Sequence, residues 1–245
     1  MASCSYCEAP LADSARFCPQ CGEEQETYRD WMRHRERPLP PDLETRWRLL
    51  GQPIRRVALA IAAGLLAGLP LAAFLGLDQE QTETVLWAYL FLDLVLFGFI
   101  LLCLWPERPR VMPSLRRLGS PWGWLAALVI GAGLPLAAKT LMGGDATEEF
   151  AAYPLPAFLS IALLPGIYEE LAFRGIVLTT MRDMVKPRTA QGLTALAFAA
   201  VHLQPASLPY LFLVGLFLGY LRQGSGSLYP CMAAHALHNA VVVFA

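Results

Sequence analysis

Charged residues are scarce in this 245-residue chain. Lys, Arg, Asp and Glu make up 16% of it, whereas hydrophobic residues make up 56%, which is too apolar for an ordinary soluble domain. The apolar residues come in long runs separated by short polar loops rather than in amphipathic stripes. A helix that crosses a hydrocarbon core of about 30 Å needs about twenty such residues. The sequence therefore predicts an all-α, multi-pass membrane protein.

Several familiar motifs are also missing. There is no G-x-S-x-G nucleophile elbow, no H-E-x-x-H on one helix, and no basic stripe that would favour nucleic-acid binding. Cys103 and Cys231 stand alone in apolar runs, which is typical of packing rather than of a nucleophile. Met1 to Gly22 lacks a basic segment followed by an apolar core. We therefore expect the first hydrophobic run, near Ile54, to be a retained anchor.

Four of the six cysteines lie near the N-terminus, as Cys4-Ser-Tyr-Cys7 and Cys18-Pro-Gln-Cys21. Two C-x-x-C pairs can close a tetrahedral shell of thiolates around one zinc ion. Such a short segment buries little apolar surface, so the metal would supply most of its folding energy. This spacing predicts a structural zinc ribbon over residues 1–22; two disulfides are the alternative reading.

Residues 23–53 are charged and rich in proline, and we expect a cytoplasmic tether. Its C-terminal part, with Trp47 among arginines, fits either a membrane-surface segment or a solvated linker. The membrane domain follows over 54–245. We expect about seven transmembrane helices, near 54–76, 84–105, 121–142, 157–178, 189–204, 208–221 and 228–245.

Basic residues gather on one side of these expected spans. With the loops numbered alternately, they lie in residues 1–56 and at Arg108, Arg110, Arg116, Arg117, Arg182, Lys186, Arg188 and Arg222. The opposite loops have no basic residue and carry Asp78, Glu80, Glu83, Asp145, Glu148 and Glu149. Lys139, near a helix end, and Arg174, inside a span, are the two exceptions. The positive-inside rule then predicts a cytoplasmic N-terminus. A reducing cytoplasm also favours zinc over disulfides for the four N-terminal cysteines.

The fourth span contains three charged residues, which are costly inside a membrane and indicate function or a buried pair. Glu170 and Arg174 are four residues apart, so they share a helix face and can form an ion pair. Glu169 is rotated by about 100° from Glu170. We therefore expect Glu169 to face a different polar group.

Two later spans contain further polar residues. Phe198 and His202 lie one turn apart in the fifth span, as do His235 and Asn239 in the seventh. At 1.5 Å per residue, Glu169 lies about 18 Å, and Asn239 about 16 Å, from one end of its span, so both are near mid-membrane. His202 falls nearer the outer side unless the fifth span is recessed.

Asp93 and His238 receive other interpretations. Asp93 stands alone in the second span, and we expect it to be the buried partner of a donor elsewhere. His238 is expected to face another helix or the membrane boundary, outside the site.

The motifs Glu-Glu-x-x-x-Arg, Phe-x-x-x-His and His-x-x-x-Asn, on successive hydrophobic segments, resemble the CPBP family. This is the CAAX protease and bacteriocin-processing (Abi) group of intramembrane endopeptidases. The resemblance covers residues 157–245, a protease-like core, and excludes the earlier spans and the ribbon.

The resemblance implies a role for each motif residue. Glu169, helped by His202, would activate water, and His235 with Asn239 would bind water or the oxyanion. Glu170 with Arg174 would hold the fourth helix or contact substrate, and Phe198 would pack beside the site. Peptide hydrolysis needs a base, charge stabilisation at the carbonyl oxygen and a proton donor for the amine.

A catalytic metal remains an open alternative at this point. Because the family is commonly labelled as metalloproteases, His202, His235 and Glu169 could instead be metal ligands that activate the water. Glutamate-activated water without an obligatory metal is the preferred prediction.

The preferred function is peptide-bond hydrolysis in or near the bilayer, on a membrane-associated peptide or protein. The first rival is a non-proteolytic scaffold or bacteriocin-immunity protein of the same fold. The second is a transporter that uses Asp93, Glu169 and the histidines as a proton path. The family resemblance favours a bacterial inner membrane, and no nucleic-acid partner is expected. The oligomeric state and the choice between a prenylated and another substrate stay open.

Overall fold

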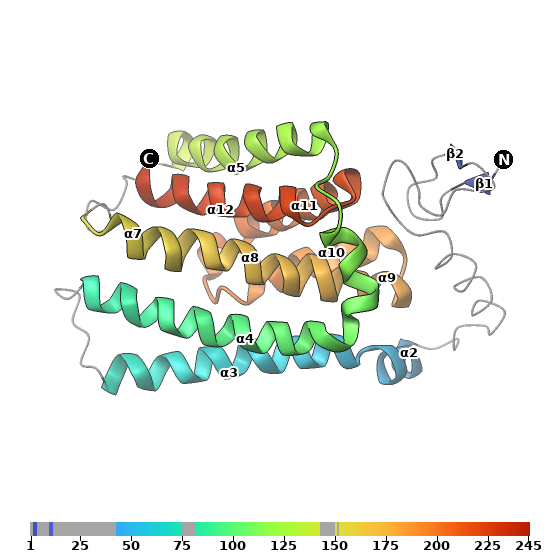
Figure 1. Cartoon of the computed structure of the whole chain (residues 1–245), viewed down its shortest axis with the longest axis horizontal. Coiled ribbons are helices and arrows are strands. Elements are labelled where there is room, and N and C mark those ends of the chain that lie inside the picture. Colours follow the sequence, from blue (N-terminus) through green and yellow to red (C-terminus); the bar gives the residue numbers. More distant parts are fainter. Residues whose placement is uncertain (1, 4–9, 12–42, 75–81, 143–149, 151) are drawn as a thin grey trace.

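A bundle of roughly parallel and antiparallel helices forms the membrane domain (Figure 1). The computed structural model describes residues 2–3, 10–11, 43–74, 82–142, 150 and 152–245. The first helices are α2 (Leu43–Leu50), α3 (Gln52–Phe74), α4 (Thr82–Leu115) and α5 (Pro121–Met142). The last are α10 (Pro187–Ala200), η4 (Pro205–Ser207), α11 (Leu208–Ser225) and α12 (Tyr229–Phe244).

The middle of the bundle is one continuous helical run with changing pitch. Its parts are α7 (Pro154–Ala157), η2 (Phe158–Leu163), α8 (Leu164–Glu170), η3 (Leu171–Val177) and α9 (Leu178–Met184). The segments η2 and η3 are π-helical, and α8, which carries Glu169 and Glu170, lies between them. Such wider turns occur often at functional sites.

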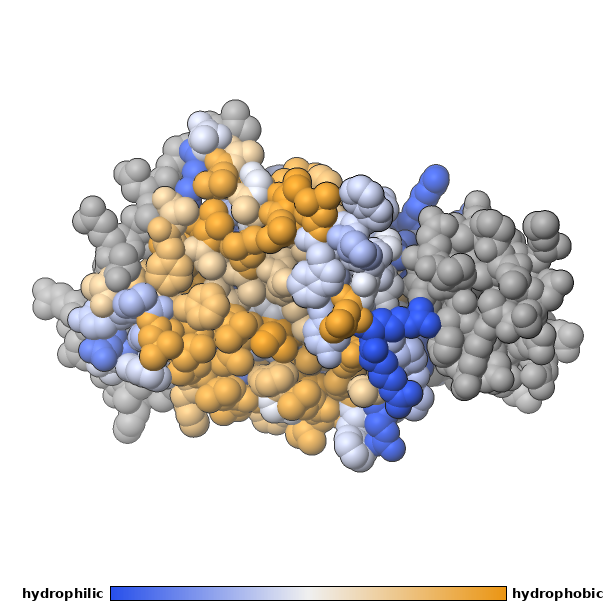
Figure 2. All heavy atoms as spheres, turned by 45° about the horizontal axis from the view of Figure 1, so that its top comes forward, coloured by the Kyte–Doolittle hydropathy of each residue, from blue (hydrophilic) through white to orange (hydrophobic). Residues whose placement is uncertain are grey.

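Each of the seven expected spans contains a described helix, and the protein is an integral membrane protein. Figure 2 shows apolar side chains covering much of the surface between more polar ends. Three of the described helices are long and apolar enough to cross a membrane: Thr82–Leu115, Pro121–Thr140 and Pro205–Ser225. The number of crossings therefore stays a prediction.

Helix α4 is longer than the sequence indicated. The expected span ended near residue 105, but the helix continues to Leu115 through Pro106, Pro109 and Pro113. The extension packs against the fourth membrane segment, since Val111 is buried and Arg110 pairs with Asp183 of α9. These tertiary contacts offset the backbone hydrogen bonds that proline cannot donate.

Helix α10 is too short to cross a bilayer. Its 14 residues span about 21 Å, less than the hydrocarbon thickness of about 30 Å. The chain then reverses through Leu203, which has a φ of 55°, a left-handed conformation uncommon for a branched side chain. His202 lies just before this reversal and just after the last residue of α10, Ala200.

Close packing between α8 and α12 depends on Gly166. A Cβ atom at Gly166 would lie 2.9 Å from the backbone nitrogen of Ala236 in α12. Glycine therefore lets the two backbones approach closely. This approach brings the glutamates of α8 beside the polar residues of α12.

The basic segments meet at one end of the bundle, where α2 and α9 lie (Figure 1). Arg46 of α2 donates to the carbonyl of Met184 at 3.0 Å. Ser227, just before α12, donates to the carbonyl of Arg117 at 2.6 Å. The end of the expected tether is thus a helix docked on the membrane domain.

Near the N-terminus, β1 (Ala2–Ser3) pairs with β2 (Pro10–Leu11) as antiparallel strands. Ala2 is opposite Leu11, and Ser3 is opposite Pro10. The four ribbon cysteines, Cys4, Cys7, Cys18 and Cys21, lie outside the described residues. So do Asp78, Glu80, Asp145, Glu148 and Glu149 of the acidic loops.

Candidate active site

A cavity of about 800 Å³ lies among α3, α4, η2, α8, η3, α11 and α12 and the turn that follows α10. Its wall is mainly apolar, with contributions from residues such as Ile61, Leu96 and Val242. Its polar lining consists of Tyr89, Asp93, Ser160, Tyr168, Glu169, His202, Gln204, Ser207, Tyr210, His238 and Asn239. Three predicted site residues, Glu169, His202 and Asn239, are therefore gathered at one place.

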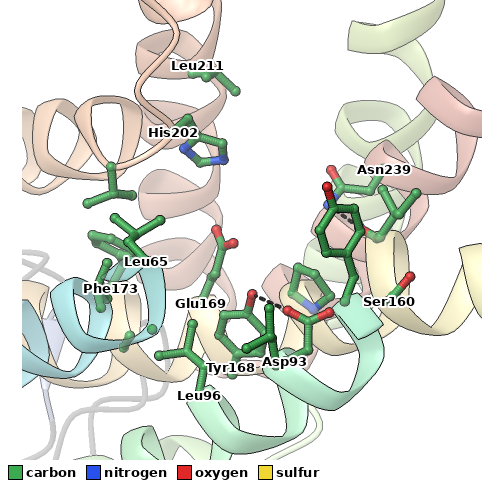
Figure 3. A pocket seen from close by; sticks show the side chains of 18 of the residues that line it. Leu65, Asp93, Leu96, Ser160, Tyr168, Glu169, Phe173, His202, Leu211 and Asn239 are labelled. Carbon is green, nitrogen blue, oxygen red and sulfur yellow. Dashed lines mark hydrogen bonds between the residues drawn. The ribbon is translucent and has the colours of Figure 1, made fainter. Parts of the chain in front are cut away.

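Glu169 projects into this cavity from α8 (Figure 3). Its Oε2 atom is buried and has no hydrogen-bond partner among the described residues. Glu169 therefore lies on the cavity side of α8 and not in the buried Glu170–Arg174 pair. A carboxylate in such a cavity can accept a hydrogen bond, or a proton, from a small molecule beside it.

His202 faces Glu169 from the end of α10 (Figure 3). Its Nδ1 atom lies 2.8 Å from the carbonyl oxygen of Phe198. A carbonyl only accepts, so Nδ1 carries the hydrogen, and in the neutral ring Nε2 is left as an acceptor. The short α10 and its sharp reversal thus present an imidazole with one nitrogen free to receive a hydrogen bond.

Asn239 lines the cavity from the side opposite His202 (Figure 3). Its Nδ2 donates to the carbonyl of Ile161 in η2 at 3.0 Å, and its Oδ1 lies 3.0 Å from His238 Nδ1. His238 Nε2 is in turn 2.6 Å from the hydroxyl of Tyr210 in α11. His238, which sequence reasoning left out of the site, is thus both a cavity residue and a neighbour of Asn239.

The other predicted residues form a separate buried cluster. Glu170 Oε1 accepts from Arg174 Nη1 at 2.7 Å and from His235 Nδ1 at 2.9 Å. Arg174 Nη2 also donates to the carbonyl of Gly215 in α11 at 3.0 Å. Glu170, Arg174 and His235 are all buried and are not among the cavity-lining residues. The cluster therefore joins α8, η3, α11 and α12.

Phe198 of α10 is buried and contacts residues of both groups. The Arg174 guanidinium carbon lies 4.4 Å from the centre of its ring, a cation–π distance. The rings of His202 and His235 lie 5.0 and 5.6 Å from the same centre, in edge-to-face arrangements. Phe198 thus holds residues of both groups against one buried ring.

Asp93 and Tyr168 form a further polar pair on the cavity wall. The Tyr168 hydroxyl donates to Asp93 Oδ1 at 3.0 Å, across α8 and α4 (Figure 3). The expectation that Asp93 accepts from a buried donor is confirmed. Its place beside Glu169 could not be read from the sequence, because Asp93 lies outside the three motifs.

The alternative metal set does not fit this arrangement. The described residues contain no group of three His, Cys, Asp or Glu side chains placed to hold a metal ion. In particular, His235 is hydrogen-bonded to Glu170, and it does not line the cavity as Glu169 and His202 do.

Comparisons with known proteins agree with the motif reading. Residues 151–241 match the model of the type II CAAX prenyl endopeptidase Rce1-like family, and residues 1–25 match a zinc-ribbon domain. The chain is similar to an uncharacterized 24.3 kDa protein of Escherichia coli, with 32% identity over 140 residues. That match covers 51% of this chain and 63% of the relative. No solved structure matches.

Proposed function

We propose that this chain is an intramembrane endopeptidase, because residues 151–241 match the model of the type II CAAX prenyl endopeptidase Rce1-like family. Its substrate would be a membrane-associated peptide or protein. The observation that carries the proposal is the convergence of Glu169 of α8, His202 of the turn after α10 and Asn239 of α12 on one cavity.

In the proposed reaction, Glu169 is the base. One of its carboxylate oxygens takes a proton from a water molecule while the water oxygen bonds to the scissile carbonyl carbon. His202 Nε2 accepts the second hydrogen of that water and orients it. The electron pair of the C=O π bond moves onto the carbonyl oxygen, which becomes an oxyanion.

Asn239 stabilises that oxyanion by donating from its amide nitrogen. The C=O bond then re-forms, the C–N bond breaks, and the leaving nitrogen takes the proton from Glu169. The products are a carboxylic acid and an amine. The mainly apolar wall excludes competing water and strengthens the electrostatic contacts inside the cavity.

The buried cluster has a positioning role in this proposal. Arg174 and His235 hold Glu170, and Phe198 packs on both of them and on His202. The cluster thereby fixes the rotation of α8, and so the direction of Glu169. His235 acts through Glu170 rather than on the substrate.

The proposal is tested by proteolysis with the purified full-length protein in liposomes and a library of membrane peptides. Glu169→Gln and Asn239→Ala are compared with wild type, and Glu83→Gln serves as a control because Glu83 is exposed at the start of α4. We expect cleavage by wild type and the control, and a loss of at least about 10²-fold in the two site variants.

Equal cleavage by wild type and Glu169→Gln would overturn the proposed mechanism. A cellular phenotype that needs the protein but survives Glu169→Gln would instead assign the chain to the scaffold or immunity class. Both results require that the variants melt as wild type does.

For residues 1–25, which match a zinc-ribbon domain, we propose that Cys4, Cys7, Cys18 and Cys21 hold one structural zinc ion. Metal analysis should find one zinc per chain, lost on Cys18→Ser with Cys21→Ser but retained in Cys103→Ala. A chelator should remove this zinc without stopping cleavage. Inhibition that is reversed by added zinc would favour a catalytic metal instead.

For the orientation, we propose a cytoplasmic N-terminus in a bacterial inner membrane. This proposal rests on the positive-inside rule and on the meeting of basic segments at the α2–α9 end. An alkaline phosphatase fused after Ala245 should be active, since it would lie outside the cytoplasm. An inactive but intact fusion would contradict this orientation.

A further inference from the structure

A chain of three hydrogen bonds runs from α11 through α12 to η2. It joins Tyr210 to His238 at 2.6 Å, His238 to Asn239 at 3.0 Å, and Asn239 to the carbonyl of Ile161 at 3.0 Å. Tyr210, His238 and Asn239 all line the cavity. None of these links involves the buried Glu170 cluster.

The direction of each bond follows from the end of the chain. The Ile161 carbonyl only accepts, so the Asn239 atom beside it is the amide nitrogen, and Oδ1 must face His238. An amide oxygen also only accepts, so His238 Nδ1 carries the hydrogen. In the neutral ring, Nε2 then accepts from the Tyr210 hydroxyl.

This pattern leaves one donor on Asn239. The amide nitrogen has two hydrogens, and only the bond to Ile161 is found for it among the residues that the structure describes. The terminal torsion of asparagine is broad and does not fix the amide plane by itself. His238 therefore supplies the contact that holds Oδ1 and keeps the nitrogen turned towards Ile161.

We propose that His238 and Tyr210 are positioning residues that fix the Asn239 amide for oxyanion binding, an inference that rests on the proposed function. His238 acts on Asn239, and Tyr210 acts through His238. The pair thus determines the orientation of an oxyanion donor from outside the three sequence motifs.

The test compares variants of the full-length protein in liposomes, on a peptide that wild type cleaves. His238→Phe keeps a ring but removes the donor, whereas His238→Asn can return an N–H near the position of Nδ1. We expect His238→Phe to lower kcat by about 10- to 100-fold with KM changed by less than about 2-fold, because only the oxyanion contact is affected.

A double-mutant comparison with Asn239→Ala distinguishes a positioning role of His238 from a general structural role. In an Asn239→Ala background, His238→Phe should cause no further loss of kcat, because the amide that it positions is already absent. His238→Asn should recover part of the activity. Tyr210→Phe should give a smaller loss of about 3- to 10-fold, while Tyr220→Phe, on the exposed side of the same helix, should give none.

The outcomes distinguish this inference from the proposed function. If wild type cleaves and Glu169→Gln does not, the protease stands. Additive losses for His238→Phe and Asn239→Ala, or a change in KM alone, would then overturn the positioning role. If His238→Phe does not fold, Tyr210→Phe is tested instead, once with Asn239 present and once in the Asn239→Ala variant. Additive losses of kcat would again overturn the positioning role.

Discussion

Glu169 and Glu170 are neighbours in the sequence and sit in opposite environments. Glu170 is fully buried and accepts hydrogen bonds from Arg174 and His235, whereas Glu169 faces the cavity with one oxygen unpartnered among the described residues. The rotation of about 100° between successive helical residues produces this division. One short motif thus supplies both a carboxylate that stabilises the bundle and one that is available for chemistry.

The largest stability effect should come from breaking the buried pair. Arg174→Met leaves the Glu170 carboxylate with His235 alone inside the bundle, and removing one partner of a buried ion pair costs about 3–5 kcal/mol. We expect thermal melting in detergent to fall sharply.

The chain offers a matched control for this change. Arg48 and Glu44 are also four residues apart, but their side chains are 73% and 84% exposed. Arg48→Met should leave melting nearly unchanged, because exposed pairs contribute little. Equal effects of the two substitutions would show that the buried cluster does not stabilise the fold.

Close approach of α8 and α12 gives the next prediction. Gly166→Ala places a methyl group 2.9 Å from the Ala236 backbone nitrogen, and overpacking of this kind costs about 1–3 kcal/mol. Cleavage should fall as well, since Glu169 and Asn239 are carried by the two helices that must separate.

Gly133 of α5 is the control, because a Cβ atom there would meet nothing within 4 Å. Gly133→Ala should leave both melting and cleavage intact. If Gly166→Ala behaves in the same way, the site does not depend on this helix contact.

The smallest effect is expected on the cavity wall. Tyr168→Phe removes the hydrogen bond to Asp93 Oδ1, which contributes about 1 kcal/mol. The melting temperature should fall slightly. KM should change more than kcat, because the Tyr168–Asp93 pair shapes the cavity wall beside Glu169. A loss of cleavage as large as that of Glu169→Gln would instead make Tyr168 part of the chemistry.

The sequence predicted the features that depend on local spacing. The four-residue separation of Glu170 and Arg174 predicted their ion pair, and helix rotation predicted that Glu169 would face elsewhere. The apolar runs predicted the helices. The tertiary contacts that extend α4 to Leu115 could not be predicted, because prolines normally end a helix.

The two histidines of α12 mark the limit of such reasoning. His235 and Asn239 share a helix face by spacing, yet His235 bonds to Glu170 while His238 contacts Asn239 and lines the cavity. The choice depends on where α11 places Tyr210 and on the Ile161 carbonyl of η2. The sequences of η2 and η3 carry no pattern that distinguishes a π-helix from an α-helix.

The most direct test of the account compares Glu169→Gln with Glu170→Gln, measuring thermal melting and peptide cleavage on the same preparations. The account predicts that Glu169→Gln melts as wild type does and does not cleave. It predicts that Glu170→Gln melts at a markedly lower temperature and keeps measurable cleavage below that temperature. The reverse pattern, with Glu169 needed for folding and Glu170 needed only for cleavage, would contradict the division between the two glutamates.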